Sequence, residues 1–391
     1  MENIKDLLTQ LSPSALLTEE EAMELFGEMS RTDAWLKPNM KSLDVSYIEP
    51  GTEPEYNIYP YSPSEQVEAA YKLGTFAITI NGTKYLMNET AQLTIGQCAQ
   101  VCSRLLSKLL DRDNPEYCDC NAAAKLYNFG LTHLGKDTLI LVRGGQVMSV
   151  FSDKYKVLPQ EEIFTSAIAQ IRDRFPNAKN IETVYDHRET VMLFELCDTQ
   201  NKIFDGYRKA WLSAGLREDE LREARFFVRI ASGDTGYSTF SALPIIMAGS
   251  SREGWKPLLS PSKAKHIGKV DTTVVDTLIA DMFAGAEESI NKLAKMMQTP
   301  LKNPQKIYKK IVKDLRLESN CKKLMQALDE SVDFLCNING ANTVVTAYGL
   351  YNAIFEIRYF KEFANLSPAV QVKINDNLSR LPNLDWDELN K

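Results

Sequence analysis

A glycine pair between two short apolar runs is the feature that most constrains how this chain can fold. Leu139–Val142 and Val147–Phe151 flank Gly144 and Gly145, and adjacent glycines supply the positive φ angles that a tight hairpin turn requires. The sequence therefore predicts a β-hairpin whose second strand leaves through a polar, basic segment, residues 152–156. We expect that exit segment to meet a partner.

The same pattern recurs along the chain. Further hairpins are predicted over residues 74–88, with an Asn81-Gly82 turn, over 181–196, and over 224–249 with a turn at 232–236. Apolar residues at spacings of three and four predict the helices that separate them. These helices cover 94–110, 122–134, 159–175 and the residues around 204–211.

From residue 271 onward the pattern becomes helical. Helices are predicted over 272–297, 304–315, 321–336, 341–360 and 368–380. Hairpins separated by helices, followed by an all-helical region, predict the α+β class with locally paired antiparallel strands. We divide the chain into residues 1–70, an α+β core over 71–270 and a helical region over 271–391.

The first 70 residues are predicted to form an N-terminal arm. Two short helices are predicted over 3–11 and 19–29, the second opening with Thr18 and Glu21 at capping-box spacing. Residues 31–64 are rich in proline and tyrosine, which predicts an extended segment with rings to bury. We expect this arm to be pinned against the core or a neighbouring subunit.

Charge is divided unevenly along the chain. Residues 1–70 hold 14 acidic and 4 basic residues, a net charge of −10, whereas residues 289–325 hold 10 basic and 2 acidic residues, a net charge of +8. The overall charge of −7 conceals this asymmetry. An acidic arm and a basic helical surface could meet each other, within or between subunits, or meet an anionic partner.

The cellular compartment is predicted from the absence of membrane-spanning and secretory signals in the sequence. No run approaches the ~20 apolar residues of a membrane span, and the first ten residues lack the basic start and apolar block of a secretory signal. Seven cysteines, an odd number, favour reduced thiols. We expect a cytoplasmic protein with no membrane contact.

Four segments of the chain carry a family resemblance. They are the second hairpin leading into the helix at Thr94, the run LVRGGQVMSVFSDKY with Arg143, Ser152, Asp153 and Tyr155, the run FFVRIASGDTG at 226–236, and KHIGK at 265–269. Their order resembles a phage- and plasmid-borne family known as domain of unknown function nine-three-two. The resemblance implies an α+β fold, a mobile-element origin and a bacterial host, and no particular activity.

Catalytic and metal-binding patterns are weak. Cys98 with Cys102, and Cys118 with Cys120, could be pooled as zinc ligands, but the first pair lies on an apolar helix face, which favours buried thiols. Residues 152–154, Ser-Asp-Lys, could suggest a nucleophile, although neighbouring strand residues point to opposite faces. No phosphate-binding glycine loop is present. We therefore expect no catalytic residue, metal or cofactor, and no enzymatic activity.

Nucleic-acid binding has better support, because basic residues are interleaved with aromatic residues that could stack on bases. Three segments have this composition: 154–156, 207–211 and 252–266. A lysine-rich predicted helix adds charges for phosphates. The candidate binding residues are Arg143, Lys154, Tyr155, Lys156, Arg252, Trp255, Lys256, Lys263, Lys265, His266, Lys306, Lys309, Lys310 and Lys313.

Two functions follow as hypotheses. The first is a sequence-independent single-stranded DNA-binding or annealing protein for recombination or replication, in which these residues converge into one trough and the arm links subunits into a homo-oligomer. The second is a protein-interaction or assembly protein of a phage, either a structural component or a host-defence inhibitor. In that case the acidic arm with its tyrosines is the contact surface.

Overall fold

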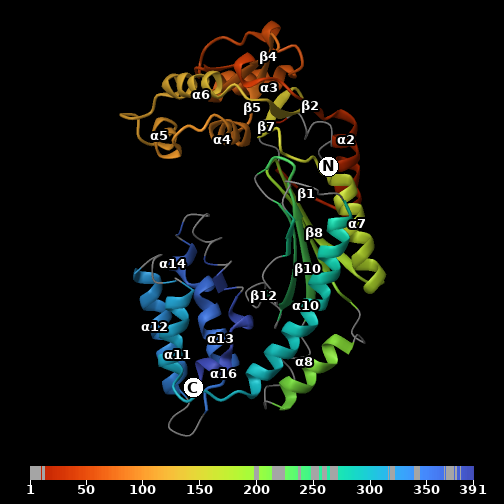
Figure 1. Cartoon of the computed structure of the whole chain (residues 1–391), viewed down its shortest axis with the longest axis vertical. Coiled ribbons are helices and arrows are strands. Elements are labelled where there is room, and N and C mark those ends of the chain that lie inside the picture. The colour runs from red at the N-terminus through yellow and green to blue at the C-terminus, as the bar shows by residue number, and fades with distance from the viewer. Residues whose placement is uncertain are drawn as a thin grey trace.

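The structure is a computed structural model whose helices and strands fall into three groups along the long axis of the molecule (Figure 1). It describes residues 10, 14–197, 202–213, 225–236, 239–247, 255–257, 262–264, 272–315, 317, 322–338, 344–364, 366, 374, 377–378 and 380–391. Two sheets with helices on their faces precede a helical region, so the predicted α+β class is confirmed. No helix in these ranges is long and apolar enough to cross a membrane.

The first group is built on a six-stranded sheet, which we call the N-terminal sheet. Its order is β2-β6-β7-β5-β4-β3, and all neighbouring strands are antiparallel except β5 and β7. The predicted hairpin is confirmed and lies in the middle of this sheet as β6 and β7. The strands are β2 (Ala34–Leu36), β3 (Leu43–Ile48), β4 (Thr75–Ile80), β5 (Thr83–Met87), β6 (Thr138–Arg143) and β7 (Gln146–Ser152).

Apolar side chains cover both faces of the N-terminal sheet. On one face, Ile78, Ile140 and Val147 pack against three helices through Ile95 and Tyr127. On the other face, a smaller cluster joins β4 and β5 to a single helix. The helices are α3 (Ser64–Leu73) on the second face and α4 (Glu89–Cys98), α5 (Ser103–Leu109) and α6 (Cys120–Leu134) on the first.

The glycine pair has the role that its spacing predicts. Gly144 and Gly145 have φ angles of 55° and 81°, the left-handed region that glycine enters at little cost. A Cβ on Gly145 would lie 2.1 Å from the carbonyl oxygen of Tyr61, and Ser62 Oγ donates to the Gly145 carbonyl at 2.8 Å. The turn is therefore glycine for two reasons, its backbone angle and its close packing under the segment that leads into α3.

The helix predicted over 94–110 is in fact two helices, α4 and α5. Gln100 has a φ of 54°, and the Val101 and Gln100 amides donate to the carbonyls of Gly96 and Gln97. This pair of bonds is the Schellman arrangement that ends a helix. The apolar spacing continues through the break because α5 packs on the same core as α4. The periodicity of the sequence therefore did not indicate where α4 ends.

The predicted N-terminal arm differs from the structure over its described residues. β1 (Ser14–Leu17) pairs with a strand of the second sheet, while β2 and β3 are the edge strands of the N-terminal sheet. Between β1 and β2, α2 (Glu19–Thr32) starts with the predicted capping box, in which the Glu21 amide donates to Thr18 Oγ1 at 3.2 Å and the Thr18 amide to Glu21 Oε2 at 2.8 Å. This segment belongs to both sheets and forms no separate arm. The helix predicted over 3–11 lies outside the described residues except for residue 10.

The second group is built on a seven-stranded antiparallel sheet, which we call the central sheet. Its order is β1-β8-β9-β10-β11-β12, with β13 also paired to β11. One face packs against α2, α7 and α10 through buried residues such as Phe26, Phe164 and Met192, and these helices lie along that face in Figure 1. The new elements are α7 (Gln160–Arg174), β8 (Lys179–Asp186), β9 (Thr190–Glu195), β10 (Arg225–Ser232), β11 (Phe240–Met247), β12 (Trp255–Pro257), β13 (Ser262–Ala264) and α10 (Thr272–Gln298).

The helical region does not begin as a separate unit at residue 271. The first half of α10 packs on the central sheet through Val275, Ile279 and Phe283, and its second half joins the C-terminal core through Leu293 and Met296. One helix therefore belongs to both hydrophobic cores, and the predicted boundary at 270/271 falls at its beginning.

The C-terminal core contains buried residues of α11, α12, α13, α14 and α16, packed around the end of α10. It also includes Trp211 of α8 (Lys202–Ser213), which packs against Tyr348. The predicted helix over 368–380 lies largely outside the described residues. The elements are α11 (Pro304–Asp314), α12 (Lys322–Ile338), α13 (Ala347–Phe355), α14 (Lys361–Ala364) and α16 (Trp386–Leu389), with the short 3-10 turns η1 (Met40–Ser42), η2 (Tyr56–Ile58), η6 (Glu356–Tyr359) and η7 (Leu381–Asn383).

Candidate nucleic-acid interface and the buried Arg143 network

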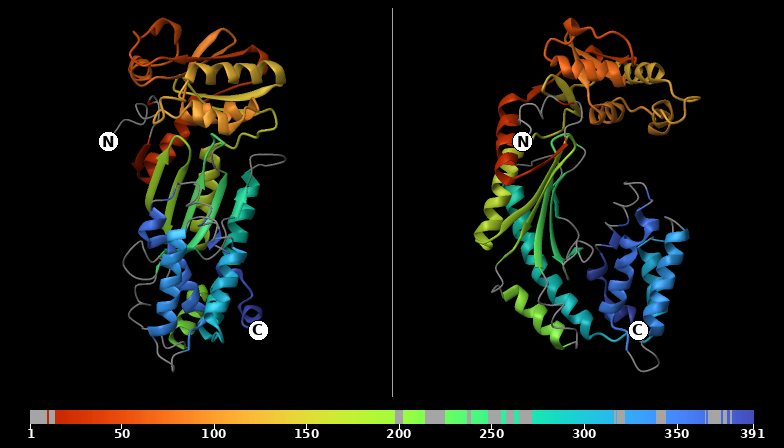
Figure 2. Two further views of the ribbon diagram at one scale, coloured as in Figure 1. Left: turned by 90° about the vertical axis from the view of Figure 1, so that its left-hand side faces the viewer. Right: turned by 180° about the vertical axis from the view of Figure 1, so that it is seen from behind.

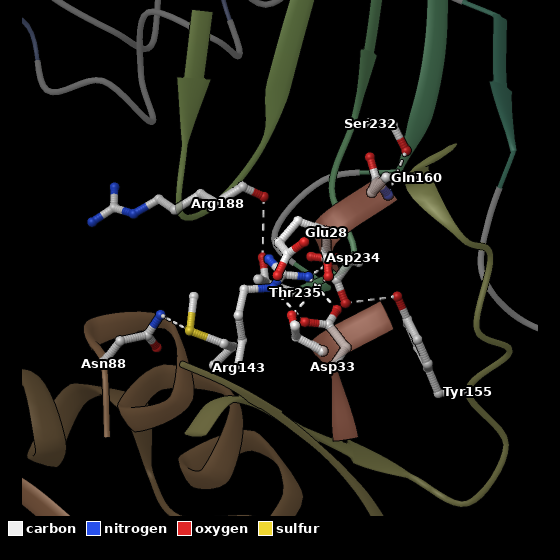
Figure 3. A network of polar contacts seen from close by, with 12 residues as sticks. Glu28, Asp33, Asn88, Arg143, Tyr155, Gln160, Arg188, Ser232, Asp234 and Thr235 are labelled. Carbon is white, nitrogen blue, oxygen red and sulfur yellow. Dashed lines mark hydrogen bonds and ion pairs between the residues drawn. The ribbon is translucent and has the colours of Figure 1, made fainter. Parts of the chain in front are cut away.

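Arg143, the last residue of β6, is the centre of a buried ion-pair network where the two sheets meet (Figure 3). Its Nε donates to Asp33 Oδ1 at 2.8 Å and its Nη2 to Asp33 Oδ2 at 2.6 Å. The same Nη2 also donates to Asp234 Oδ2. Asp33 is the residue after α2, and Asp234 lies in the turn between β10 and β11.

Burial and charge oppose each other in this network. Only 2% of the Arg143 side chain is exposed. Burial disfavours its charge, but the carboxylates of Asp234 and Asp33 outweigh burial and raise the Arg143 pKa. Burial also raises the pKa of Asp33, although Arg143 acts in the opposite direction. Two carboxylates therefore share one guanidinium in a site that is nearly closed to solvent.

Further hydrogen bonds fix the β10–β11 turn between the sheets. Ser149 Oγ of β7 donates to the Thr235 carbonyl at 2.6 Å, and Thr235 Oγ1 donates to the Arg188 carbonyl at 3.0 Å. Tyr155 Oη donates to the Asp234 carbonyl at 3.1 Å. The turn is thus held by β7, by the residues after β7 and by the β8–β9 turn.

The cavity beside Arg143 is small. It has a volume of about 10 Å³ and is lined by Gln160, Tyr185, His187 and Ser232, among others. Such a volume holds about one water molecule, far less than the several hundred Å³ of a typical small-molecule site. The network is suited to joining the sheets and has no room for a substrate.

The structure removes Arg143 from any nucleic-acid-binding surface, because its guanidinium is buried among intramolecular partners. Tyr155 is half-buried; its ring stacks on Phe151 with centroids 3.7 Å apart and lies 6.2 Å from that of Trp35. Lys154 and Lys156 are exposed in the loop after β7. Of this segment, only the two lysines are placed where a polyanion could reach them.

The third aromatic and basic segment, 252–266, is described only in part. Trp255 and Lys256 lie in β12 and Lys263 in β13, both paired with β11. Arg252, Lys265 and His266 lie outside the described residues. Their contribution to binding therefore stays a prediction.

The lysines of α11 form one exposed patch, which we call the lysine face: Lys306, Lys309, Lys310 and Lys313. Their spacings of three and four place all four side chains next to one another, while Ile307, Tyr308, Ile311 and Val312 anchor the opposite side of the helix in the C-terminal core.

No carboxylate of the described residues pairs with the lysine face. By contrast, on α10 Lys292 pairs with Glu288 at 2.7 Å and Lys295 pairs with Asp387. The four ammonium groups of the lysine face are therefore exposed and form no ion pair with the described residues, and Asp314 at the end of α11 is the acidic residue of this helix.

The candidate lysines after β7 and those of α11 do not converge. β7 and its exit loop lie in the upper part of the molecule, whereas α11 lies in the C-terminal helices at the opposite end, in every view (Figures 1 and 2). The expectation of one trough joining Lys154 and Lys156 to the lysine face is therefore wrong, because these segments belong to different hydrophobic cores.

The cysteines considered for zinc are free thiols: Cys98, Cys102, Cys118 and Cys120. Burial raises the Cys98 pKa to about 11, which disfavours the thiolate that binds metal. Over the described residues, no group of three or more His, Cys, Asp or Glu side chains is arranged to hold a metal ion.

Sequence reasoning missed the partners of Arg143. Asp33 and Asp234 lie 110 and 91 residues from it, and no local pattern links them. The proline and tyrosine content of 31–64 signalled burial but not the strand pairing of β2 and β3.

Comparison with known proteins finds no matching family model, no similar curated protein and no similar solved structure.

Proposed function

We propose that this chain is a non-enzymatic nucleic-acid-binding protein that holds the phosphates of a single strand along the lysine face of α11. On this proposal it acts without sequence preference, in recombination or replication of a phage or plasmid within the cytoplasm of a bacterial host. The observation that carries the proposal is the clustering of Lys306, Lys309, Lys310 and Lys313 on one exposed helix face, where none of them forms an ion pair with the described residues.

The geometry of α11 fits a polyanion better than a compact ligand. From Lys306 to Lys313 the helix rises by about 10 Å, so the ammonium groups form a strip and not a pocket. Each phosphate that a lysine neutralises releases counterions, which makes affinity for single strands fall with salt at a logarithmic slope of about −0.7 per contact. Four contacts predict a slope of about −3 from this helix.

The test is a titration of a labelled single-stranded oligonucleotide by fluorescence anisotropy across a range of salt concentrations. The triple variant Lys306→Gln, Lys310→Gln, Lys313→Gln is expected to weaken binding at low salt and to reduce the slope by about 2.

The matched control is Lys72→Gln, Lys125→Gln, Lys136→Gln, which removes the same charge from exposed lysines of the N-terminal group. Equal effects of the two triple variants, or wild-type affinity that is absent at low salt, would reject the proposal.

A protein-interaction or assembly role is the second candidate. It is favoured by Tyr61, which is 64% exposed and stacks on Tyr85 with ring centroids 5.9 Å apart, in a segment with several exposed carboxylates. Exposed aromatic rings are enriched where proteins associate. Analytical ultracentrifugation of wild type and Tyr61→Ser tests self-association at this surface. A monomer in both removes the homo-oligomer from this role.

A further inference from the structure

A groove lies between the last turns of α10 and residues 382–387, which we call the C-terminal segment. The proposed function does not involve this groove. Its volume is about 320 Å³, within the range of small-ligand sites. Met296 and Trp386 are almost fully buried at its apolar floor. The rim carries groups of both kinds, hydrogen-bond donors and acceptors: Lys292, Lys295, Thr299, Asn383, Asp385 and Asp387.

Specific contacts hold the two walls of the groove together. Lys292 Nζ donates to Asn383 Oδ1 at 3.1 Å, and Lys295 Nζ donates to Asp387. Below the rim, Trp386 Nε1 donates to the Leu381 carbonyl at 3.3 Å. The C-terminal segment is therefore fixed against α10, and the groove is a built feature of the fold.

The groove and α11 are joined by the short segment from Thr299 to Asn303. Asn390 follows the C-terminal wall, and its side chain accepts from the Lys302 amide and donates to the Pro300 carbonyl, both at 2.8 Å. Lys302 is exposed, three residues after Thr299 of the groove wall and four residues before Lys306. A strand whose phosphates extend from the lysine face to Lys302 would therefore come near the groove wall at Thr299.

The chemistry of the groove suits a base and not a phosphate. Two ammonium groups and two carboxylates give the rim a net charge near zero, so it adds little attraction for an anion. A nucleobase has a flat face for an apolar floor and an edge with both donors and acceptors, which carboxylate, amide and ammonium groups can pair.

We propose that this groove receives one unstacked base of the strand whose phosphates lie on Lys302 and the lysine face. This inference rests on the proposed function and adds a consequence to it: the protein distinguishes single strands from duplexes. In a duplex the base edge is paired and its faces are stacked, so entry would require the base to be flipped out.

The test compares an intact oligonucleotide with an abasic strand of the same length, which keeps the phosphates and lacks the bases. Wild type is expected to bind the intact strand about tenfold more tightly, a typical contribution of one held base. Asn383→Trp, which fills the mouth of the groove from an exposed position, is expected to lose that tenfold advantage while its affinity for the abasic strand stays unchanged.

Asn337→Trp is the matched control, the same substitution at an exposed position of α12, and is expected to keep the advantage. Asp387→Asn provides a second variant of similar size. Because the substitution turns a hydrogen-bond acceptor into a group that also donates, it is expected to change the order of the protein's affinities for the four homopolymeric strands.

Two results overturn the inference. Equal binding of intact and abasic strands by wild type, with loss of both in the α11 variant, rejects the groove and leaves the proposed function standing. An unchanged advantage in Asn383→Trp together with an unchanged ranking in Asp387→Asn also rejects it. Absence of binding to either strand at low salt rejects the proposed function itself.

Discussion

At the scale of single residues, the shared guanidinium of Arg143 is the most consequential feature. A buried arginine needs a carboxylate partner, and the sequence offered no indication of which one, or that there are two. With two carboxylates and one guanidinium, the network carries an excess negative charge away from water. Burial is the largest cause of the raised pKa of Asp33, Arg143 acts against it, and the carboxylate of Asp234 adds a smaller contribution in the same direction as burial.

The raised pKa of Asp33 predicts a pH-dependent contribution to folding stability. A carboxyl group whose pKa is higher in the folded chain binds a proton more readily there, so its contribution is present below the unfolded pKa of about 3.9 and is lost as the pH rises through the folded pKa. Asp33→Asn removes this titration. We therefore expect its unfolding free energy to fall less than that of wild type as the pH rises from about 4 towards neutrality, as measured by urea denaturation.

Asp113→Asn, the same substitution at an exposed aspartate, is the control for that experiment. Identical pH slopes in Asp33→Asn and wild type would show that Asp33 takes up no proton on folding.

At the scale of secondary-structure elements, the sequence predicted most hairpins and helices because their signals are local. Asn81-Gly82 and Gly144-Gly145 both have positive φ angles, which their turns require, and Thr18 and Glu21 form the expected capping box. The errors occur where long-range packing decides. The break between α4 and α5 is formed by Gln100 without a glycine or proline, and β2 is only three residues long.

The long helix α10 contains a buried polar group that lowers the free energy of unfolding, and a single substitution can remove it. Ser289 is fully buried between the two halves that serve different cores, and its hydroxyl oxygen has no hydrogen-bond partner in the part of the chain that the structure describes. A buried polar group without a partner costs about 1 to 3 kcal/mol, and alanine has the higher helix propensity. Ser289→Ala is expected to raise the free energy of unfolding by about 1 kcal/mol in thermal or urea denaturation.

Ser213→Ala is a useful comparison, because the Ser213 hydroxyl donates to the Lys209 carbonyl at the end of α8. We expect no gain there. A loss of stability in Ser289→Ala would contradict the assignment of an unsatisfied hydroxyl.

At the scale of the whole molecule, the three largest hydrophobic cores are joined by two kinds of connection. The central sheet and the C-terminal helices share α10, an apolar and continuous link. The two sheets share the β1-α2-β2 segment, which gives one strand to each, and are joined further by polar contacts, the Arg143 network and the pair between Arg188 and Glu89 at 2.8 Å. Neither link was predictable from the sequence, since each depends on residues that are brought together only by the complete fold. The lysine face was predictable, because helix periodicity alone groups its four side chains.

These two connections predict which parts of the molecule lose stability when one of them is broken. Arg143→Met keeps much of the side-chain volume but leaves the carboxylates of Asp33 and Asp234 buried without their cation, a change that typically costs about 3 to 5 kcal/mol. We expect hydrogen exchange to increase in β6, β7, the end of α2 and the β10–β11 turn. Exchange in α11 and α12 should stay as in wild type, because their core lies beyond α10.

The same variant separates stability from binding. Since α11 and α16 lie far from β7 in the ribbon (Figure 1), Arg143→Met is expected to bind a single-stranded oligonucleotide with wild-type affinity at temperatures where it remains folded. Lys306→Gln, Lys310→Gln, Lys313→Gln should show the reverse, weak binding with wild-type exchange in both sheets. If Arg143→Met lost its affinity while α11 kept its protection, nucleic acid would have to contact the sheet junction, and the binding surface would need to be placed there.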